Sequence, residues 1–345
     1  MKTSIISVAA LMLCLGWAAG CAKKQSSIWE SIKSPEIVTQ LKSFVAQKEV
    51  QANAATNAPS PEVKAFFAAA GRGDWLAVSN AFMDFRNHAG QYERLPEASW
   101  QAVLETWGAL DAFGEGNEKY SALFAKDIIQ SIPPGSIYFG GTDPGQLLIT
   151  AMQKDQAAGD PFFTIPPHEL TDAAYLNYLR AMYGGKIHTP AAGDLQKCSE
   201  DYTNDVVRRL QTHQLKPGEQ VAKDASGQVR ISGYMATIEV RALMTKLVFD
   251  QNSNREFYVE ESFPLDWMYP YEEPHGVIMK INRQPFAQLP DEIVQRDEDY
   301  WSKLIAPMIG DWLNKDTSLD DVTAFVKKVY VKKDLSGFTG DKDFL

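Results

Sequence analysis

Apolar residues in the first part of the chain recur every three to four residues, which is the spacing of one face of an amphipathic helix. Ile37, Leu41 and Phe44 form one such stripe. The triplets at 34–36 and 60–62 both read Ser-Pro-Glu. Each triplet combines a capping hydroxyl, a first-turn proline and an acid near the positive end of the helix dipole, so each predicts the start of a helix.

The stretch FFAAAGRGDWLAVSNAFMDF (66–85) contains two helical patterns in succession. Gly73 predicts the end of the first helix, and Asp74 is placed to cap the second. This stretch resembles one helical hairpin of a tetratricopeptide-like array, although the chain shows no recurrence at the length of that repeat. Two further helices are predicted at about 97–113 and 117–130.

The pattern changes at Pro133, after which short β-branched and aromatic runs alternate with helical patterns. Four strands are predicted, at 136–139, 162–165, 256–260 and 277–281. Strands that alternate with helices favour a parallel sheet covered on both faces. The sequence therefore predicts an α/β fold with a small, mainly parallel sheet and covering helices, preceded by an N-terminal all-helical region.

These changes of pattern divide the chain into four segments. They are a lipoprotein signal peptide at 1–20, a tether and helix at 21–60, helical hairpins at 61–131 and an α/β domain at 132–345. Within the last segment, residues 221–232 predict a small β-hairpin.

The N-terminus has the pattern of a secretory signal peptide. Lys2 precedes an apolar run at 5–15 and then AAGC at 18–21. The apolar run is too short to cross a bilayer, which needs about 20 residues. The small residues before Cys21 resemble a bacterial lipobox, in which the cysteine is acylated. The alternatives are an ordinary signal peptide, or an uncleaved anchor, with a chance cysteine.

The lipobox resemblance implies where the protein resides. Two acyl chains hold a protein stably on a membrane. We therefore expect the chain to be attached to the cell envelope through Cys21. Ala22, which follows that cysteine, favours the outer membrane, with the protein facing the periplasm.

Composition narrows the function further. The formal net charge is −10 and no basic block occurs, so nucleic acid is not an expected partner. Cys14 falls within the signal peptide, which leaves Cys198 without a disulfide partner, and a buried apolar role is favoured over a nucleophile there. The five histidines lack metal-ligand spacing. The segment at 168–172 could supply ligands, but a structural loop is favoured, and no metal or cofactor is predicted.

The stretch SIYFGGTDPGQLLITAM (136–152) is the first candidate for chemistry. Its glycines have the spacing of a phosphate loop, but Gln146 and Leu147 stand where that motif needs a lysine and a hydroxyl. Ligands of open α/β sheets bind beyond the carboxyl ends of the strands, where Thr142 and Asp143 are expected. The alternative, which the sequence favours, is that Asp143 only caps the helix that begins at the next residue.

The stretch EFYVEESFPLDWMYPYEEPHG (256–276) is the second candidate. Glu260 and Glu261 end a strand on opposite faces, so one of them can point into a cleft. Trp267 or Tyr271 could cover that cleft, because aromatic rings stack on the apolar faces of sugars while carboxylates accept their hydroxyls. The alternative, again favoured, is a loop of aromatic residues packed on the core.

Four stretches carry a resemblance to a known group. They are IPPGSIYFGGTDPG, YLRAMYGGKI, FYVEESFPLDWMYP and DLSGFTGDKDF. Together they resemble a group of uncharacterised bacterial envelope proteins over most of residues 60–345. Two of them also resemble the soluble domain of multi-pass membrane proteins suspected of glycosyl transfer, in which a strand ends in Gly-Asp before a helix, as at Gly141 and Asp143.

The sequence therefore predicts a lipid-anchored envelope protein whose α/β domain binds a small polyhydroxylated ligand or a partner's glycan. One alternative is a glycan-processing enzyme of the envelope that uses Asp143, Glu260 or Glu261, and catalytic residues are otherwise unassigned. The other alternative is a protein-interaction module that works through the N-terminal helical hairpin.

Overall fold

The computed structural model describes residues 27–55, 60–87, 97–153, 159–223, 229–232, 234–260, 265–312 and 316–344. The predicted signal peptide and Cys21 lie outside these residues. Among the residues that are described, no helix is both long and apolar enough to cross a membrane.

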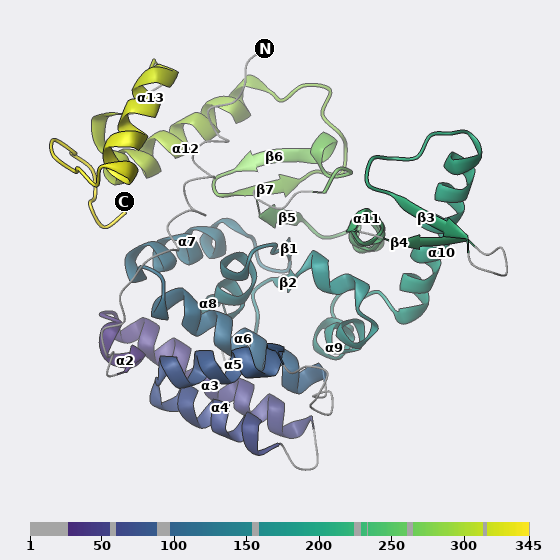
Figure 1. The fold of residues 1–345 in the computed structure, drawn as a ribbon, viewed down its shortest axis with the longest axis horizontal. Coiled ribbons are helices and arrows are strands. Elements are labelled where there is room, and N and C mark those ends of the chain that lie inside the picture. Colours follow the sequence, from purple (N-terminus) through teal and green to yellow (C-terminus); the bar gives the residue numbers. More distant parts are fainter. Residues whose placement is uncertain are drawn as a thin grey trace.

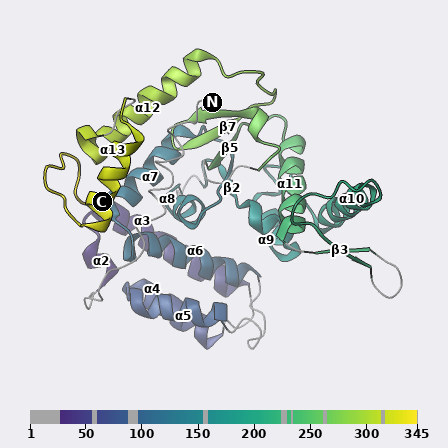
Figure 2. The same ribbon diagram turned by 45° about the horizontal axis from the view of Figure 1, so that its top comes forward.

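Within the described residues, six helices make up the N-terminal region (Figures 1 and 2). They are α2 (Ile28–Ser31), α3 (Pro35–Ala54), α4 (Pro61–Arg72), α5 (Trp75–Asn87), α6 (Glu97–Gly114) and α7 (Glu118–Ser131). The predicted start and stop signals are confirmed. The hydroxyls of Ser34 and Ser60 accept hydrogen bonds from backbone N–H groups in the first turns of α3 and α4. Gly73 ends α4 at φ 73°, and Asp74 caps α5.

The centre of the molecule is a five-stranded sheet in the order β2-β1-β5-β7-β6. The strands are β1 (Ile137–Phe139), β2 (Phe163–Ile165), β5 (Phe257–Glu260), β6 (Glu272–His275) and β7 (Ile278–Ile281). Strand β1 is parallel to both of its neighbours, whereas β7 is antiparallel to β5 and to β6. The prediction of an α/β fold with a preceding helical region is confirmed, and each of the four predicted strands forms. The sheet is mixed, with a parallel core of β2, β1 and β5 and an antiparallel edge of β7 and β6.

Strand β6 was not predicted. Its sequence, EEPH, lacks β-branched and aromatic residues, and its proline cannot donate a hydrogen bond to a sheet ladder. It forms at the sheet edge, where a missing donor is tolerated, because it pairs with β7 along its whole length.

The two faces of the sheet are buried in two hydrophobic cores. Tyr138 and Tyr258 point into a core shared with the helical region and with α8 (Ile149–Gln153). On the other face, Ile137 and Phe257 point into a core shared with α9 (Ala173–Tyr183) and α11 (Tyr234–Gln251). The first core explains why the N-terminal helices pack directly against the sheet.

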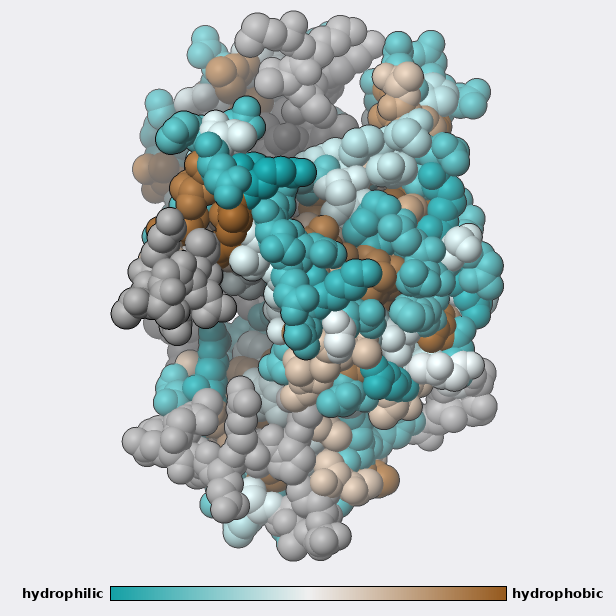
Figure 3. Space-filling model, turned by 90° about the vertical axis from the view of Figure 1, so that its right-hand side faces the viewer, coloured by the Kyte–Doolittle hydropathy of each residue, from teal (hydrophilic) through white to brown (hydrophobic). Residues whose placement is uncertain are grey.

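The remaining elements extend this framework. They are η1 (Pro144–Leu148), η2 (Pro167–Thr171), α10 (Ala192–Gln211), β3 (Gln220–Lys223), β4 (Val229–Ser232), η3 (Tyr269–Tyr271), α12 (Asp291–Ile309), η4 (Gly310–Trp312), α13 (Leu319–Val326) and η5 (Lys327–Val331). Strands β3 and β4 form the predicted hairpin and project with α10 from one side of the molecule (Figure 1). That side is mainly hydrophilic, with apolar residues in small separate groups (Figure 3).

The C-terminal segment returns to the helical region. The carboxylate of Asp341 forms an ion pair with Lys119 and accepts a hydrogen bond of 2.7 Å from the Tyr120 hydroxyl. The ring of Phe344 packs edge-on against Tyr120 at 5.0 Å between centroids. Segments more than 200 residues apart in the sequence are thus joined at the start of α7.

Candidate functional site

The strand order creates a topological switch point between β1 and β5. The chain leaves β1 and crosses to β2 on one side, and it later returns to form β5 on the other side of β1. The first connection contains α8, which packs on one face of the sheet, and the second contains α9 and α11, which pack on the other. In open α/β sheets such a switch point is the usual place for a ligand, outside the carboxyl ends of the strands.

The carboxylate of Glu260 holds the loop after β1 at this point. One oxygen accepts hydrogen bonds from the backbone N–H groups of Gly141 (2.8 Å) and Thr142 (2.7 Å), and the other accepts one from the Thr142 hydroxyl. Glu260 is buried, with 4% of its surface exposed. We call this arrangement the Glu260 latch.

Glycine makes the latch possible. A Cβ atom on Gly145 would lie 2.0 Å from a carboxylate oxygen of Glu260, and one on Gly140 would lie 2.7 Å from the Gly145 carbonyl. No side chain fits at either position unless the loop moves. The glycines that resemble a phosphate loop therefore serve close packing, and the N–H groups of Gly141 and Thr142 already hold the Glu260 carboxylate.

The structure corrects the expected role of Asp143 as a helix cap. Asp143 has helical φ and ψ angles, and its side chain makes no capping hydrogen bond. The Thr142 hydroxyl instead accepts the Gly145 N–H at 3.0 Å, and the Thr142 carbonyl accepts the Gln146 N–H. The cap lies one residue earlier because the latch fixes Thr142 in position. The Asp143 side chain is exposed and serves no capping function.

The charge of Asp143 acts on two neighbouring groups that come from other elements. On α6, burial raises the pKa of the Asp111 carboxyl to about 6, with Glu115 and Asp143 adding to the effect. In η2, burial lowers the pKa of His168, Arg241 lowers it further, and Asp143 opposes both. The groups near the end of β1 are therefore an exposed acid, a carboxyl with a pKa of about 6 and an imidazole whose pKa is lowered.

Thr142, Asp143 and Glu260 are thus brought together at the switch point, as predicted from the sequence. Their roles differ, because Thr142 and Glu260 are bonded to each other whereas Asp143 is exposed. Glu261 lies outside the described residues.

Trp267 and Tyr271 lie elsewhere. Both pack on Phe249, at 5.3 and 6.2 Å between ring centroids, and Phe249 packs on Phe257 at the start of β5. The Trp267 indole N–H donates to the Thr245 hydroxyl at 3.2 Å. These aromatic residues therefore belong to the core at the opposite end of β5 from Glu260, which is the arrangement that the sequence favoured over a cover for the site.

Two residues near the site were not predicted. Asp111 is an acid within the otherwise apolar helical stretch ALDAF (109–113), and its apolar neighbours could have marked it in the sequence as a buried acid. Arg241 lies on α11, where nothing in the local pattern separates it from a solvated charge. Among the described residues, no group of three or more His, Cys, Asp or Glu side chains is arranged to hold a metal ion.

Comparison of the chain with protein-family models, with curated proteins and with solved structures gave no match.

Proposed function

We propose that this protein is a lipid-anchored component of the cell envelope whose α/β domain binds a small polyhydroxylated ligand or glycan at the β1–β5 switch point. The observation that carries the proposal is the placement of Asp143. This carboxylate is exposed, has no capping role and stands at the carboxyl end of the central parallel strand. The proposed attachment at Cys21 rests on the signal-peptide pattern described above.

The charges at the site favour hydroxyl groups over an anion. Asp143 and Asp111 both repel negative charge, and the two backbone N–H groups at 141 and 142 are occupied by Glu260. A carboxylate can accept hydrogen bonds from two neighbouring sugar hydroxyls, and the neutral His168 ring can donate or accept one more. Asp143 would bind the ligand, while Thr142 and Glu260 would position the loop that carries it.

The test begins with an array of peptidoglycan fragments and outer-membrane oligosaccharides. The best-binding glycan is then titrated into the wild-type protein, into Asp143→Asn and into Asp266→Asn. Asp266 is an exposed aspartate of the loop that carries Trp267, which packs at the opposite end of β5, so it is a matched control. We expect the Asn substitution at Asp143 to weaken binding by about tenfold, the cost of one charge-assisted hydrogen bond, and the control to bind as the wild type does.

Full binding by a folded Asp143→Asn variant would remove Asp143 from the site. Binding of no glycan on the array would favour the interaction module instead. In the α4–α5 hairpin, Leu76 and Met83 are exposed on the face of α5 that points away from the core. That face would then be the candidate surface for binding a partner protein.

A glycan-processing enzyme is the second candidate, and Asp111 is the observation that favours it. Glycoside hydrolysis uses one carboxyl that is protonated near neutral pH and one carboxylate that is not. Asp111, whose pKa burial raises to about 6, is the candidate for the first role, and the exposed Asp143 is the candidate for the second. Release of reducing ends from the bound glycan, lost in both Asp111→Asn and Asp143→Asn, would support this activity. Unchanged release in either variant would contradict it.

A further inference from the structure

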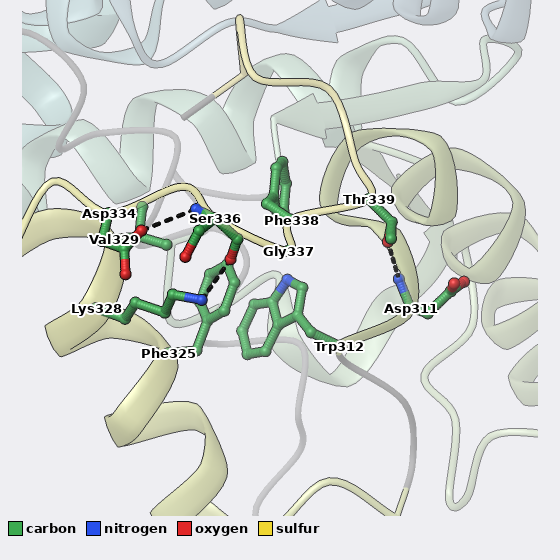
Figure 4. Close-up of a pocket in the computed structure, with 10 residues that line it drawn as sticks. All are labelled: Asp311, Trp312, Phe325, Lys328, Val329, Asp334, Ser336, Gly337, Phe338 and Thr339. Carbon is green, nitrogen blue, oxygen red and sulfur yellow. Dashed lines mark hydrogen bonds between the residues drawn. The ribbon is translucent and has the colours of Figure 1, made fainter.

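The helix α13 and the short π-helix η5 that continues it have two different faces. The inner face packs on the rest of the C-terminal segment. The Phe325 ring stacks on Trp312, with 3.5 Å between ring centroids, and Phe338 lies 5.9 Å from Phe325 (Figure 4). Val329, in η5, is buried. The outer face of the same two elements is turned away from this packing.

The outer face carries a stripe of apolar residues. Leu319, Val322, Val326 and Val331 follow one another at intervals of three, four and five residues. The first two intervals return to the same face of an α-helix. The last interval does so in a π-helix, and here the Lys332 N–H donates to the carbonyl five residues earlier, at 3.0 Å. The four apolar side chains therefore share one face.

This stripe is poorly covered by the rest of the protein. Leu319 is 80% exposed and Val331 is 75% exposed, the largest fractions among the large apolar side chains of the described residues. Val322 and Val326 between them are half-buried, and no residue of α13 itself is buried. An exposed apolar surface that is continuous, unlike scattered single residues, marks a place of interaction.

Lysines border the stripe at its C-terminal end. They occur as two pairs, Lys327 with Lys328 and Lys332 with Lys333, which an apolar triplet separates in the sequence. The π-helix brings the pairs together, because positions five apart are neighbours in it. Three of the four side chains are exposed, whereas the Lys328 ammonium donates to the Ser336 carbonyl (Figure 4).

Three acids of this segment offset part of the positive charge. Asp320 and Asp321 lie in the first turn of α13, at the opposite end from the lysines. Asp334 follows the second pair and interacts electrostatically with Lys328 and Lys332. Four lysines thus face one aspartate at this end, which leaves it positive in a protein whose formal net charge is −10.

We propose that the outer face of α13 and η5, which we call the α13 face, lies on an anionic lipid surface. The apolar stripe enters the boundary between headgroups and acyl chains, and the exposed lysines contact lipid phosphates while their alkyl stems lie along the membrane. The positive charge selects an anionic bilayer over a neutral one. Nucleic acid would also attract the lysines, but it would leave the apolar stripe in water.

The position of the α13 face agrees with the proposed lipid anchor. In Figures 1 and 2, α13 and α2 lie on the same side of the molecule, and α10 lies on the opposite side. Ser27, the N-cap of α2, follows shortly after Cys21 in the sequence, so acylation there would bring this side close to the bilayer. A lipid chain and a basic surface together give stable attachment. The α13 face makes its own contact and does not depend on acylation of Cys21.

The test measures how fast individual lysines of the full-length protein are acetylated by an uncharged succinimidyl ester, read by mass spectrometry. Vesicles of phosphatidylcholine are compared with vesicles of equal parts phosphatidylcholine and phosphatidylglycerol. We expect the anionic vesicles to slow acetylation of Lys327 and Lys332 about fivefold. Lys186 and Lys197, which are exposed near α9 and on α10, serve as internal controls and should not change. An acyl chain enters both kinds of vesicle, so failure of the anchor would not alter this comparison.

A variant tests the apolar stripe while it keeps all four lysines. Leu319→Gln/Val331→Gln should lose most of the protection, so that acetylation with anionic vesicles comes within about twofold of the rate with neutral ones. Leu76→Gln is the matched control, because Leu76 is 70% exposed on α5, and it should keep full protection. Thermal melting shows whether each variant folds, and the comparison of vesicles on the wild type stands without any variant.

Equal acetylation of Lys327 and Lys332 with both kinds of vesicle would overturn the proposal. Full protection of the folded Leu319→Gln/Val331→Gln variant would do the same. Two other outcomes would also overturn it by assigning the face to another partner. Protection by duplex DNA that is as strong in the double variant as in the wild type would indicate nucleic acid. Protection that grows with protein concentration in the absence of vesicles would indicate a second copy of the chain.

Discussion

At the scale of the residue, the helix cap at Thr142 shows that a local sequence pattern does not decide which of two adjacent residues will cap a helix. The run Thr-Asp-Pro-Gly allows either Thr142 or Asp143 to cap the following helix, because both side chains are good N-caps. The choice is made by Glu260, which is 118 residues away in the sequence and holds the Thr142 hydroxyl. The sequence could predict which residues meet at the end of β1, but not which of them would be left exposed.

This assignment predicts opposite effects for two adjacent substitutions. Thr142→Val keeps the shape of the side chain but loses the hydrogen bonds to Glu260 and from Gly145, so it should lower the free energy of unfolding by about 2–3 kcal/mol. Asp143→Ala should change it by less than about 0.5 kcal/mol, as expected for an exposed side chain without a role in folding. Urea denaturation measures both. If Asp143→Ala lowered the free energy of unfolding as much as Thr142→Val does, Asp143 would be the helix cap after all.

The raised pKa of Asp111 predicts a pH dependence of stability. Its folded pKa is about 6 and its unfolded value is 3.8, so the folded state holds the proton more tightly. Stability from this group is therefore present below about pH 4 and is lost as the pH rises through about 6. The loss should be about 2 kcal/mol after allowance for solvent screening.

Asp111→Asn isolates that contribution. The difference in unfolding free energy between the wild type and Asp111→Asn should grow in favour of the variant between about pH 4 and pH 7. Glu272, whose pKa burial raises to about 7, adds a slope of the same sign to both proteins and so cancels in the difference. Parallel stability curves for the two proteins would show that Asp111 titrates normally.

At the scale of the element, periodicity predicted most of the fold. Helix starts at Ser34 and Ser60 and the strands around β1 and β5 carry strong local signals, and each formed as expected. Strand β6 carries none, because its four residues are polar or proline, and it forms only because β7 offers an unpaired edge. A strand that forms only because it pairs with a neighbouring strand cannot be predicted from its own residues.

A network of buried polar side chains joins α3 and α6 of the helical region to α9 of the α/β domain. Lys48 of α3 is fully buried and forms an ion pair with Glu105 of α6. Glu105 also accepts from the Tyr178 hydroxyl of α9 at 3.0 Å, and Gln51 donates to that hydroxyl at 3.1 Å. The network connects the helical region to the α/β domain through groups that must all be satisfied at once.

Breaking this ion pair on one side should be costly. Lys48→Met leaves the Glu105 carboxylate buried without its counter-charge, and we expect a loss of about 3–5 kcal/mol in the free energy of unfolding. The double variant Lys48→Met/Glu105→Gln removes both charges and should lose clearly less. A double-mutant cycle by chemical denaturation gives both values. Equal and additive losses would show that the two residues act separately.

At the scale of the whole molecule, the contacts of longest range could not be predicted. At the C-terminal turn the backbone N–H of Asp341 donates to the Met308 carbonyl at the end of α12, and the Asp341 carboxylate and the Phe344 ring fasten the chain end to α7. The residues concerned are ordinary surface types in a polar tail. Their partners lie on α7, more than 200 residues away in the sequence, so no local pattern identifies them.

The proposed attachment to the envelope makes a prediction at the same scale. Cys21→Ala removes the acylated thiol, so the protein should be released from membranes or remain as an unprocessed precursor. Metabolic labelling with palmitate, followed by membrane fractionation, measures this directly. Palmitate incorporation that survives the substitution would contradict lipidation at Cys21.

The central claim is that the carboxyl ends of β1 and β5 form the binding site, with Asp143 as the contact and the Glu260 latch as its support. The most direct measurement is a crystal structure of the protein soaked with the best-binding glycan from the array. We predict a sugar hydroxyl within hydrogen-bonding distance of Asp143, while Glu260 remains bonded to Thr142 as it is in the free protein. A glycan bound elsewhere, with the ends of β1 and β5 empty, would contradict the account.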